Sequence, residues 1–325
     1  MKKNTGLIAV CILAIAAVVA ASVFLVVRNI KNEKTVDVPA PSDTEPRVVV
    51  WDSGNAPASD IPVSEIPSES GEIIPDSEDI GNNDSEIVSE PEGSEIRVSD
   101  EEIRAFFANS VFVGDSIFVG YRDYLAREKT QLASGATFLA ASSYTSAHAL
   151  EEDDKLHPIF RGKKQPVWEN IKEMGAGHVF IMFGTNDLVV KDGIRASSDV
   201  FALIDKIHEV NPDVEVTIIS MVPVYEDVSK GALNNPTIDI YNYYLLAAAA
   251  DHNADFIDIN TSLKDEKGNI KEEYCSDNYV HETDKAYSEV WNPALTAYAT
   301  EQLQKAAKEQ TEEQTEEQTE EQTQE

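Results

Sequence analysis

Residues 110–121 read SVFVGDSIFVGY, an apolar run that stops at Gly-Asp-Ser and resumes as a helical pattern. A continuous apolar run of this length is typical of a strand that is buried on both faces of a sheet. A helix that starts directly after such a strand leaves only a tight turn between the two. The stretch therefore predicts a strand–turn–helix unit that presents Ser116 at a rigid strand end.

Four further apolar runs follow, and helical patterns separate the runs. They are ATFLAAS (136–142), HVFIMFG (178–184), VEVTIISMV (214–222) and ADFIDI (254–259). One helix is predicted around Leu203 and Ile207, ending before Pro212, and another begins with Asn235 as its cap and Pro236 at its first position. Because the runs are continuous rather than alternating, they predict a parallel sheet with helices on both faces. We predict an α/β fold, namely a flavodoxin-like, doubly wound, three-layer α/β/α domain with a five-stranded parallel sheet.

The predicted folded domain spans residues 99–305 and is flanked by segments of different composition. It opens with SDEE, in which Ser99 and Glu102 form a capping box. Residues 1–34 contain a long uncharged apolar run, and a helix needs about 20 such residues to cross a bilayer core. Residues 35–98 are rich in Ser, Glu, Asp and Pro, which predicts an acidic disordered linker.

The remaining composition limits the partners of the chain. Residues 306–325 repeat Glu-Glu-Gln-Thr, and because a helix polar on every face has nothing to pack against, we expect a solvated, low-complexity acidic tail. The formal net charge is −33, and a polyanion repels the phosphates of nucleic acids, so the charge argues against nucleic acid and we expect no nucleic-acid partner. Cys11 and Cys275 provide no disulfide framework, and no metal or cofactor site is predicted.

The flanking segments also predict a location. The anchor within residues 1–34 is expected to remain uncleaved, because apolar residues continue past the small residues that a cleavage site needs. Positive residues flank both ends of the apolar run, so they do not decide its orientation. The acidic linker is typical of an extended stalk outside a membrane. We expect a single-pass protein of the cell membrane whose folded domain is extracellular.

The residues at the strand ends carry the chemistry, because doubly wound sheets bind ligands beyond the carboxyl ends of their strands. Ser116 follows the first strand, and Asn186 and Asp187 follow the third in the sequence FGTND. After the last strand comes the loop CSDNYVHET, which holds Asp277 and His281. We expect these side chains to meet at one edge of the sheet.

These motifs, VGDSI, then FGTND, then a late loop with Asp and His, resemble the SGNH (GDSL) hydrolase family of esterases and acyltransferases. The resemblance extends over about two hundred residues, the whole predicted domain. It implies the SGNH hydrolase fold, with Ser116 as the nucleophile and His281 as the general base. It also implies that Asn186 and the Ser116 backbone N–H are donors in an oxyanion hole.

The chemistry of these residue types agrees with those roles. A serine hydroxyl is a poor nucleophile until a base removes its proton, and a histidine suits that task. The start of a helix directs free N–H groups and a partial positive charge at a developing oxyanion near Ser116. A neutral amide such as Asn186 can donate there, whereas a carboxylate opposes the negative charge. We therefore expect Asp115 and Asp187 to orient loops rather than to act as acids.

Two departures from the family pattern stand in the sequence. The family has a glycine after the second strand as a further oxyanion N–H donor, whereas this chain has LAASSYTS. Ser142 or Ser143 can donate the same N–H provided that its φ is not positive, and we predict Ser143. The family also spaces its Asp and His by two residues, where this chain has Asn278. Either Asp277 reaches His281 from one position further back, or a backbone carbonyl orients the histidine; we expect Asp277.

Together these features predict a surface-exposed serine esterase that acts through an acyl-Ser116 intermediate on an ester-bearing small molecule or a cell-wall glycan. The resemblance suggests O-acetyl groups on glycans of the cell envelope as the substrate class. Two alternatives remain open. An O-acyltransferase would use the same site and pass the acyl group to a sugar hydroxyl instead of water. A non-catalytic binding or scaffold protein on this fold is favoured by the absent glycine and the shifted aspartate.

Overall fold

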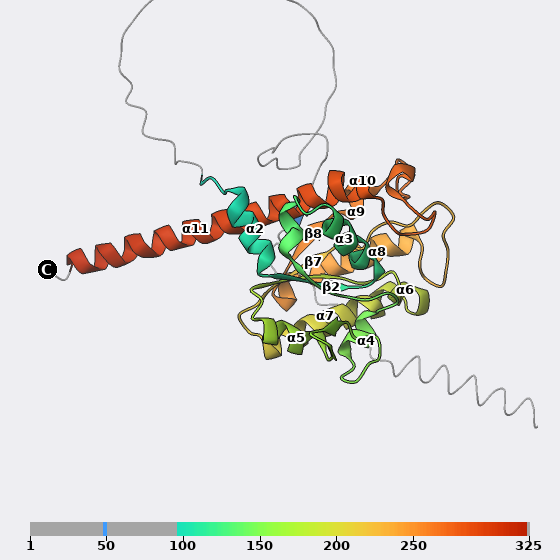
Figure 1. Ribbon diagram of the computed structural model, residues 1–325, viewed down its shortest axis with the longest axis horizontal. Coiled ribbons are helices and arrows are strands. Elements are labelled where there is room, and N and C mark those ends of the chain that lie inside the picture. Colours follow the sequence, from blue (N-terminus) through green and yellow to red (C-terminus); the bar gives the residue numbers. More distant parts are fainter. Residues whose placement is uncertain (1–47, 51–95, 324–325) are drawn as a thin grey trace, which may run out of the picture. The chain divides into compact units, whose positions relative to one another are not determined.

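The centre of the molecule is a parallel sheet with the strand order β1-β8-β7-β6-β2-β3, seen in the computed structural model, which describes residues 48–50 and 96–323 (Figure 1). All five predicted strands are present: β2 (Ser110–Gly114), β3 (Thr137–Ala140), β6 (His178–Met182), β7 (Glu215–Ile219) and β8 (Ala254–Asp258). Numbered along the chain, these five strands lie across the sheet in the order second, first, third, fourth, fifth. This is the flavodoxin-like doubly wound order. The predicted fold class is confirmed.

Helices cover both faces of the sheet (Figure 1). One face carries α2 (Asp100–Ala108), α3 (Ser116–Arg127) and α11 (Asn292–Thr323), and the other carries α5 (Val167–Met174) and α7 (Gly193–Val210), against which α8 (Asn235–Ala248) packs. The short helices are α4 (Ser146–Leu150), α6 (Asp187–Val190), α9 (Asn260–Leu263) and α10 (Asp284–Ala286). Single turns are η1 (Leu132–Gly135), η2 (Ala250–His252), η3 (Glu272–Tyr274) and the π-helical η4 (Tyr287–Trp291), and β4 (Ile159–Phe160) pairs with β5 (Lys163–Lys164) in a small hairpin.

Aromatic side chains join the central strands on one face of the sheet. The ring of Phe112 on β2 stacks between Phe138 on β3 and Phe180 on β6, with centroid distances of 4.9 and 4.6 Å. Every residue of β2 and β6 is buried, as a strand covered on both faces requires. This packing fixes the register of the two strands whose ends carry Ser116 and Asn186.

Gly114 ends β2 at a point where the backbone of β6 comes close. A Cβ added at Gly114 would lie 2.3 Å from the Met182 carbonyl oxygen and 2.8 Å from the ring of Phe118. The first of these contacts is with backbone, which cannot move aside as a flexible side chain can. Glycine is therefore required for the close approach that brings the ends of β2 and β6 together.

The predicted helix boundaries hold with one correction. The Ser99–Glu102 capping box is present, with the Glu102 carboxylate accepting the Ser99 N–H at 2.7 Å. The predicted cap of α8 is wrong by one residue, because Asn234 caps the helix and accepts the Thr237 N–H at 3.0 Å. Asn235 instead bonds both backbone groups of Val224, at 2.8 and 2.9 Å, and so ties the loop after β7 to the helix.

The flanking segments differ from expectation at two places. Val48–Val50, inside the predicted disordered linker, form strand β1 and pair in parallel with β8 at the edge of the sheet. The predicted tail continues helix α11 to Thr323, and its residues 308–312 are exposed. The tail is helical because the first half of α11 is already docked through buried residues such as Tyr298, so no new nucleus is needed to extend it.

The predicted membrane anchor within residues 1–34 and most of the predicted linker lie outside the described residues. None of the helices formed by residues 96–323 has both the length and the apolar character that a membrane span needs. The anchor and the domain boundaries therefore stay predictions.

Gly114→Ala tests the close approach of β2 and β6. We expect the free energy of unfolding to fall by about 1–3 kcal/mol or more, because the added methyl group meets the Met182 carbonyl oxygen and must push the strands apart. Urea denaturation measures the change. Gly135→Ala is the control, since the added Cβ there meets its nearest atom at 3.5 Å, an ordinary contact. Equal stability of both variants would contradict the argument.

Candidate active site

Ser116 is the first residue of α3, directly after β2. The carboxylate of Asp115 caps this helix by accepting the Ile117 N–H at 3.0 Å, which leaves the Ser116 hydroxyl free to turn outward. The serine is partly exposed although β2 behind it is fully buried. The strand thus supplies a rigid support, and the start of the helix supplies a positive electrostatic potential at the hydroxyl.

Three of the predicted site residues meet in one hydrogen-bonded chain. His281 Nε2 lies 3.0 Å from Ser116 Oγ, and His281 Nδ1 lies 2.5 Å from Asp277 Oδ2. An ionised carboxylate can only accept, so Nδ1 carries the hydrogen and Nε2 of the neutral ring accepts from the serine hydroxyl. This is the tautomer that a histidine needs to take a proton from serine.

Asp277 reaches His281 from four positions back because the loop between them is tightly turned. Asn278, at the spacing the family uses, has a φ of 53°, a left-handed conformation that Asn tolerates. The turn lets Asp277 Oδ1 accept the backbone N–H groups of Tyr279, Val280 and His281 at 2.9, 3.0 and 3.2 Å. Burial opposes ionisation of Asp277, but the hydrogen bonds from the His281 side chain and these N–H groups outweigh it and lower its pKa.

Two of the three predicted oxyanion donors, Asn186 and Ser143, lie on the loops after β6 and β3. Asn186 Nδ2 is 3.4 Å from Asp115 Oδ2 and 3.4 Å from the Tyr144 carbonyl oxygen. Its amide therefore lies between the turn that follows β2 and the loop that follows β3, which we call the β3 loop. Both contacts are long, which leaves the amide able to turn to a stronger acceptor. Ser143 is exposed and precedes Tyr144 in the β3 loop.

The condition set for Ser143, that its φ is not positive, is not met. Its φ is 62°, and it is the third residue of a turn in which the Tyr144 N–H bonds the Ala141 carbonyl oxygen at 3.3 Å. This is the turn position that favours glycine, which explains why the family has a glycine there. A serine can occupy it at a cost of roughly 1–2 kcal/mol.

Comparison with known families agrees with the motifs. A model of the GDSL-like lipase/acylhydrolase family matches residues 112–288, more than half of the chain. The chain belongs to this family. The predicted resemblance to SGNH (GDSL) hydrolases is therefore confirmed, and a comparison with curated proteins found no match.

Solved structures of several bacterial proteins are similar to this family member. A GDSL-like lipase from Bacteroides thetaiotaomicron is 18% identical with a TM-score of 0.47, over 58% of this chain and 86% of that one. A protein from Bacteroides fragilis described as an acylhydrolase is 16% identical with a TM-score of 0.46, over 60% and 87%. The periplasmic domain of a lipopolysaccharide acetyltransferase from Salmonella ser. Paratyphi A is 18% identical with a TM-score of 0.39, over 57% and 83%.

Asp187 holds the β3 loop against the β6 loop, a contact that the sequence did not indicate. Its Oδ1 accepts both the backbone N–H of Ser146, at 3.0 Å, and the Ser146 hydroxyl, at 2.5 Å. Both residues are buried, and burial raises the pKa of Asp187 although the bonds from Ser146 oppose the rise. Because Asp187 follows Asn186 and Ser146 follows the Ser143 turn, this contact fixes the two predicted oxyanion donors relative to each other.

Two further carboxyl groups near Ser116 are buried. Burial raises the pKa of Asp115 to about 7, against the hydrogen bond from Ile117, and the neighbouring Asp187 adds to the rise. Glu282, directly after His281, is also buried, and burial raises its pKa well above its ordinary range. Sequence reasoning missed Glu282, because nothing in the local pattern shows that a charged residue type points into the core there.

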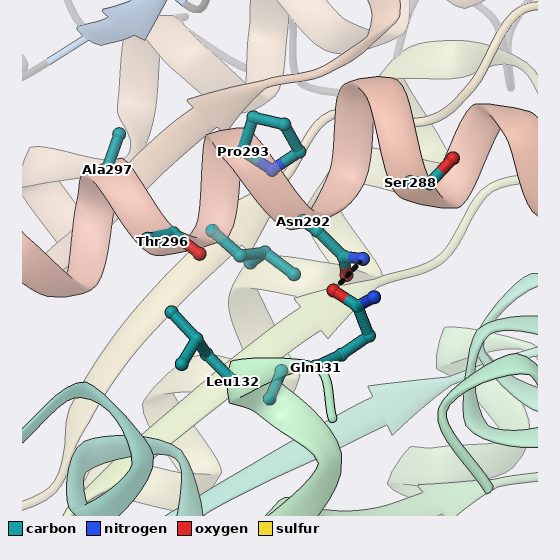
Figure 2. A pocket seen from close by; sticks show the side chains of 9 residues that line it. Gln131, Leu132, Ser288, Asn292, Pro293, Thr296 and Ala297 are labelled. Atoms are coloured by element: carbon teal, nitrogen blue, oxygen red, sulfur yellow. Dashed lines mark hydrogen bonds between the residues drawn. The ribbon is translucent and has the colours of Figure 1, made fainter. Parts of the chain in front are cut away.

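A separate pocket lies between η1 and the start of α11 (Figure 2). Leu132, Pro293 and Thr296 are among its lining residues, and Asn292 donates to the Gln131 side chain at 2.9 Å beside it. None of its lining residues belongs to the loops that carry Ser116, Asn186 or His281. Within the described residues, no three His, Cys, Asp or Glu side chains gather as metal ligands would.

Ser143→Gly and Ser143→Val together test the use of the backbone N–H at this position. Glycine removes the strain of a positive φ but raises the entropy of the unfolded chain, and the two effects offset each other, so we expect unchanged activity and a change in unfolding free energy of less than about 1 kcal/mol. A β-branched valine is poorly tolerated at a positive φ, so activity and stability should both fall. Turnover of p-nitrophenyl acetate and urea denaturation measure the two effects. Equal loss of activity in both variants would show that the serine side chain itself is needed.

Asp115→Asn tests the buried carboxyl group. Its folded-state pKa of about 7 lies above the ordinary value of 3.8, so the folded protein holds the proton more tightly than the unfolded chain does. The wild-type free energy of unfolding therefore gains a contribution below about pH 4 that is lost as the pH rises through about 7. Asparagine keeps the cap and cannot ionise, so the variant should lack this loss.

Urea denaturation of wild type and Asp115→Asn, at about pH 5 and about pH 8, measures the difference. We expect the unfolding free energy of the variant, relative to that of wild type, to be about 1–4 kcal/mol higher at about pH 8 than at about pH 5. Parallel pH dependence of the two proteins would mean that Asp115 ionises as an exposed carboxylate does.

Proposed function

We propose that the protein is a serine esterase that works through an acyl-Ser116 intermediate. The observation that carries the proposal is the continuous chain from Ser116 Oγ through His281 to Asp277, with distances of 3.0 and 2.5 Å. The hydrogens of this chain point in the direction that proton removal from serine requires. Family membership supports acyl hydrolysis in general, and the geometry supports the particular residues.

In the proposed first half-reaction, Ser116 Oγ attacks the ester carbonyl carbon while its proton passes to His281 Nε2. The carbonyl π electrons move onto the oxygen, and the oxyanion accepts hydrogen bonds from Asn186, from the Ser143 N–H and from the N–H at the start of α3. The intermediate collapses, the C–O bond to the alcohol breaks, and His281 returns the proton to the departing alkoxide. Water then repeats the sequence on the acyl-serine and releases the carboxylic acid.

The electrostatics of the site agree with this mechanism. Asp277 has a lowered pKa and remains ionised, so it stabilises the imidazolium that forms on His281. Asp115 has a pKa of about 7, so below that pH it is mostly neutral and does not oppose an oxyanion beside Ser116. The ionised carboxylate of Asp277 thus lies beside His281, and the mostly neutral carboxyl group of Asp115 lies beside the proposed oxyanion.

The proposed substrates are O-acetyl groups on a glycan of the cell envelope, and the proposed location is the outer face of the cell membrane. The sequence supports the location through the apolar run within residues 1–34 and the acidic composition of residues 35–98. An ester-bearing small molecule in the same place is the alternative substrate.

The experiment is labelling of the full chain with a fluorophosphonate probe, together with acetate release from purified cell-wall glycan. We expect wild type to be labelled and to release acetate. Ser116→Ala and His281→Ala should lose both, with kcat/KM on a small ester lowered by about 10⁴-fold or more. Ser198→Ala, at an exposed position of α7 whose hydroxyl bonds only the Ile194 carbonyl oxygen of its own helix, is the folded control.

The other outcomes favour the other functions. Acetyl transfer to an added glycan hydroxyl in preference to water would make the protein an O-acyltransferase that uses the same acyl-serine. Glycan binding by a folded wild type that the probe does not label would contradict catalysis and favour a binding protein.

A further inference from the structure

Tyr144, next to Ser143 in the β3 loop, is fully buried and bonded to a histidine behind the loop. Its hydroxyl lies 2.7 Å from Nδ1 of His157, which is 2% exposed. The other ring nitrogen of His157, Nε2, lies 2.7 Å from the backbone carbonyl oxygen of Glu151.

The partners of His157 decide its tautomer. The Glu151 carbonyl oxygen can only accept, so Nε2 carries the hydrogen, and Nδ1 of the neutral ring is left as an acceptor. Burial raises the pKa of Tyr144, so its hydroxyl keeps its hydrogen and donates it to Nδ1. His157 is therefore bound at both nitrogens, and it holds the Tyr144 side chain at one position.

Tyr144 connects this buried pair to the predicted oxyanion hole. Its carbonyl oxygen accepts from Asn186 Nδ2 at 3.4 Å, and its N–H closes the turn that contains Ser143 by bonding the Ala141 carbonyl oxygen at 3.3 Å. A movement of Tyr144 thus changes the position of the Ser143 N–H and moves the carbonyl oxygen that Asn186 contacts. A serine at a φ of 62° keeps that conformation only where its surroundings impose it, and Tyr144 is its immediate neighbour.

We propose that His157 is a positioning residue for the oxyanion hole, and that it acts through the hydroxyl of Tyr144. The inference rests on the proposed esterase function of Ser116. His157 touches no reacting atom, and its effect is to keep the loop of the Ser143 N–H in place before the oxyanion forms, together with the Tyr144 carbonyl oxygen that Asn186 contacts. Loss of its acceptor nitrogen leaves the Tyr144 hydroxyl without a partner and allows the loop to move.

The test compares variants of the full chain on p-nitrophenyl acetate, a substrate too small to depend on distant contacts. His157→Leu removes the acceptor of the Tyr144 hydroxyl. It should lower kcat by about 10–100-fold and leave KM within about threefold of wild type. This loss is smaller than the loss in kcat expected when a whole oxyanion donor is removed. His157→Asn places Oδ1 where Nδ1 stands and should restore kcat to within about fivefold of wild type. Tyr144→Phe should resemble His157→Leu, and the double variant should be no worse than either, because one contact is broken in all three.

A second buried Tyr–His pair provides the matched control. His178, at the start of β6, lies 3.3 Å from the Tyr298 hydroxyl and is 3% exposed, at the opposite end of the strand from Asn186. His178→Leu should lower the thermal unfolding midpoint as His157→Leu does while leaving kcat unchanged. Circular dichroism verifies the fold of each variant.

Unchanged kcat in a folded Tyr144→Phe or His157→Leu protein, with wild type active, would overturn the positioning role and leave the esterase proposal intact. A kcat of His157→Asn as low as that of His157→Leu would also overturn it, because the acceptor at Nδ1 would not be the feature that matters. A wild type that neither turns over the ester nor reacts with the fluorophosphonate overturns both proposals.

Discussion

The close contact between the ends of β2 and β6 is the constraint on which the site depends. Gly114 has no Cβ because the Met182 carbonyl oxygen occupies that space, and the aromatic stack through Phe112 fixes the register of both strands. Asp115–Ser116 and Asn186–Asp187 therefore leave the sheet side by side. Every later contact in the site, from the Asn186 amide to the Ser146 hydroxyl, starts from that alignment.

Three carboxyl groups around Ser116 each hold a loop in place, and their different surroundings shift their pKa values in different directions. Asp115, Asp187 and Asp277 each accept backbone N–H groups and so hold a loop in place. Asp277 is partly exposed and accepts from three N–H groups and His281, so its pKa is lowered, whereas burial raises the pKa of Asp115 and Asp187. The only one of the three with a lowered pKa is thus the one that faces the histidine.

The fold and the order of the motifs were predictable because apolar runs and strand ends are local patterns. Features that depend on conformation or on distant partners were not. The reach of Asp277 depends on a left-handed Asn278, the pairing of Val48–Val50 depends on an open edge of β8, and the burial of Glu282 depends on how its loop packs. The Asp187–Ser146 contact joins residues that are 41 positions apart, so neither short motif indicates it.

The missing glycine shows how such distant contacts compensate for a local departure. A serine at a φ of 62° is unfavourable by itself, so the turn around Ser143 needs support from its neighbours. That support surrounds the turn: the Ala141 N–H bonds the Gly114 carbonyl oxygen, the Tyr144 hydroxyl bonds His157, and Ser146 bonds Asp187. The first contact is to β2, the strand before Ser116, and the last is to the loop of Asn186. The loop that departs most from the family sequence is therefore anchored to both elements with which it has to act.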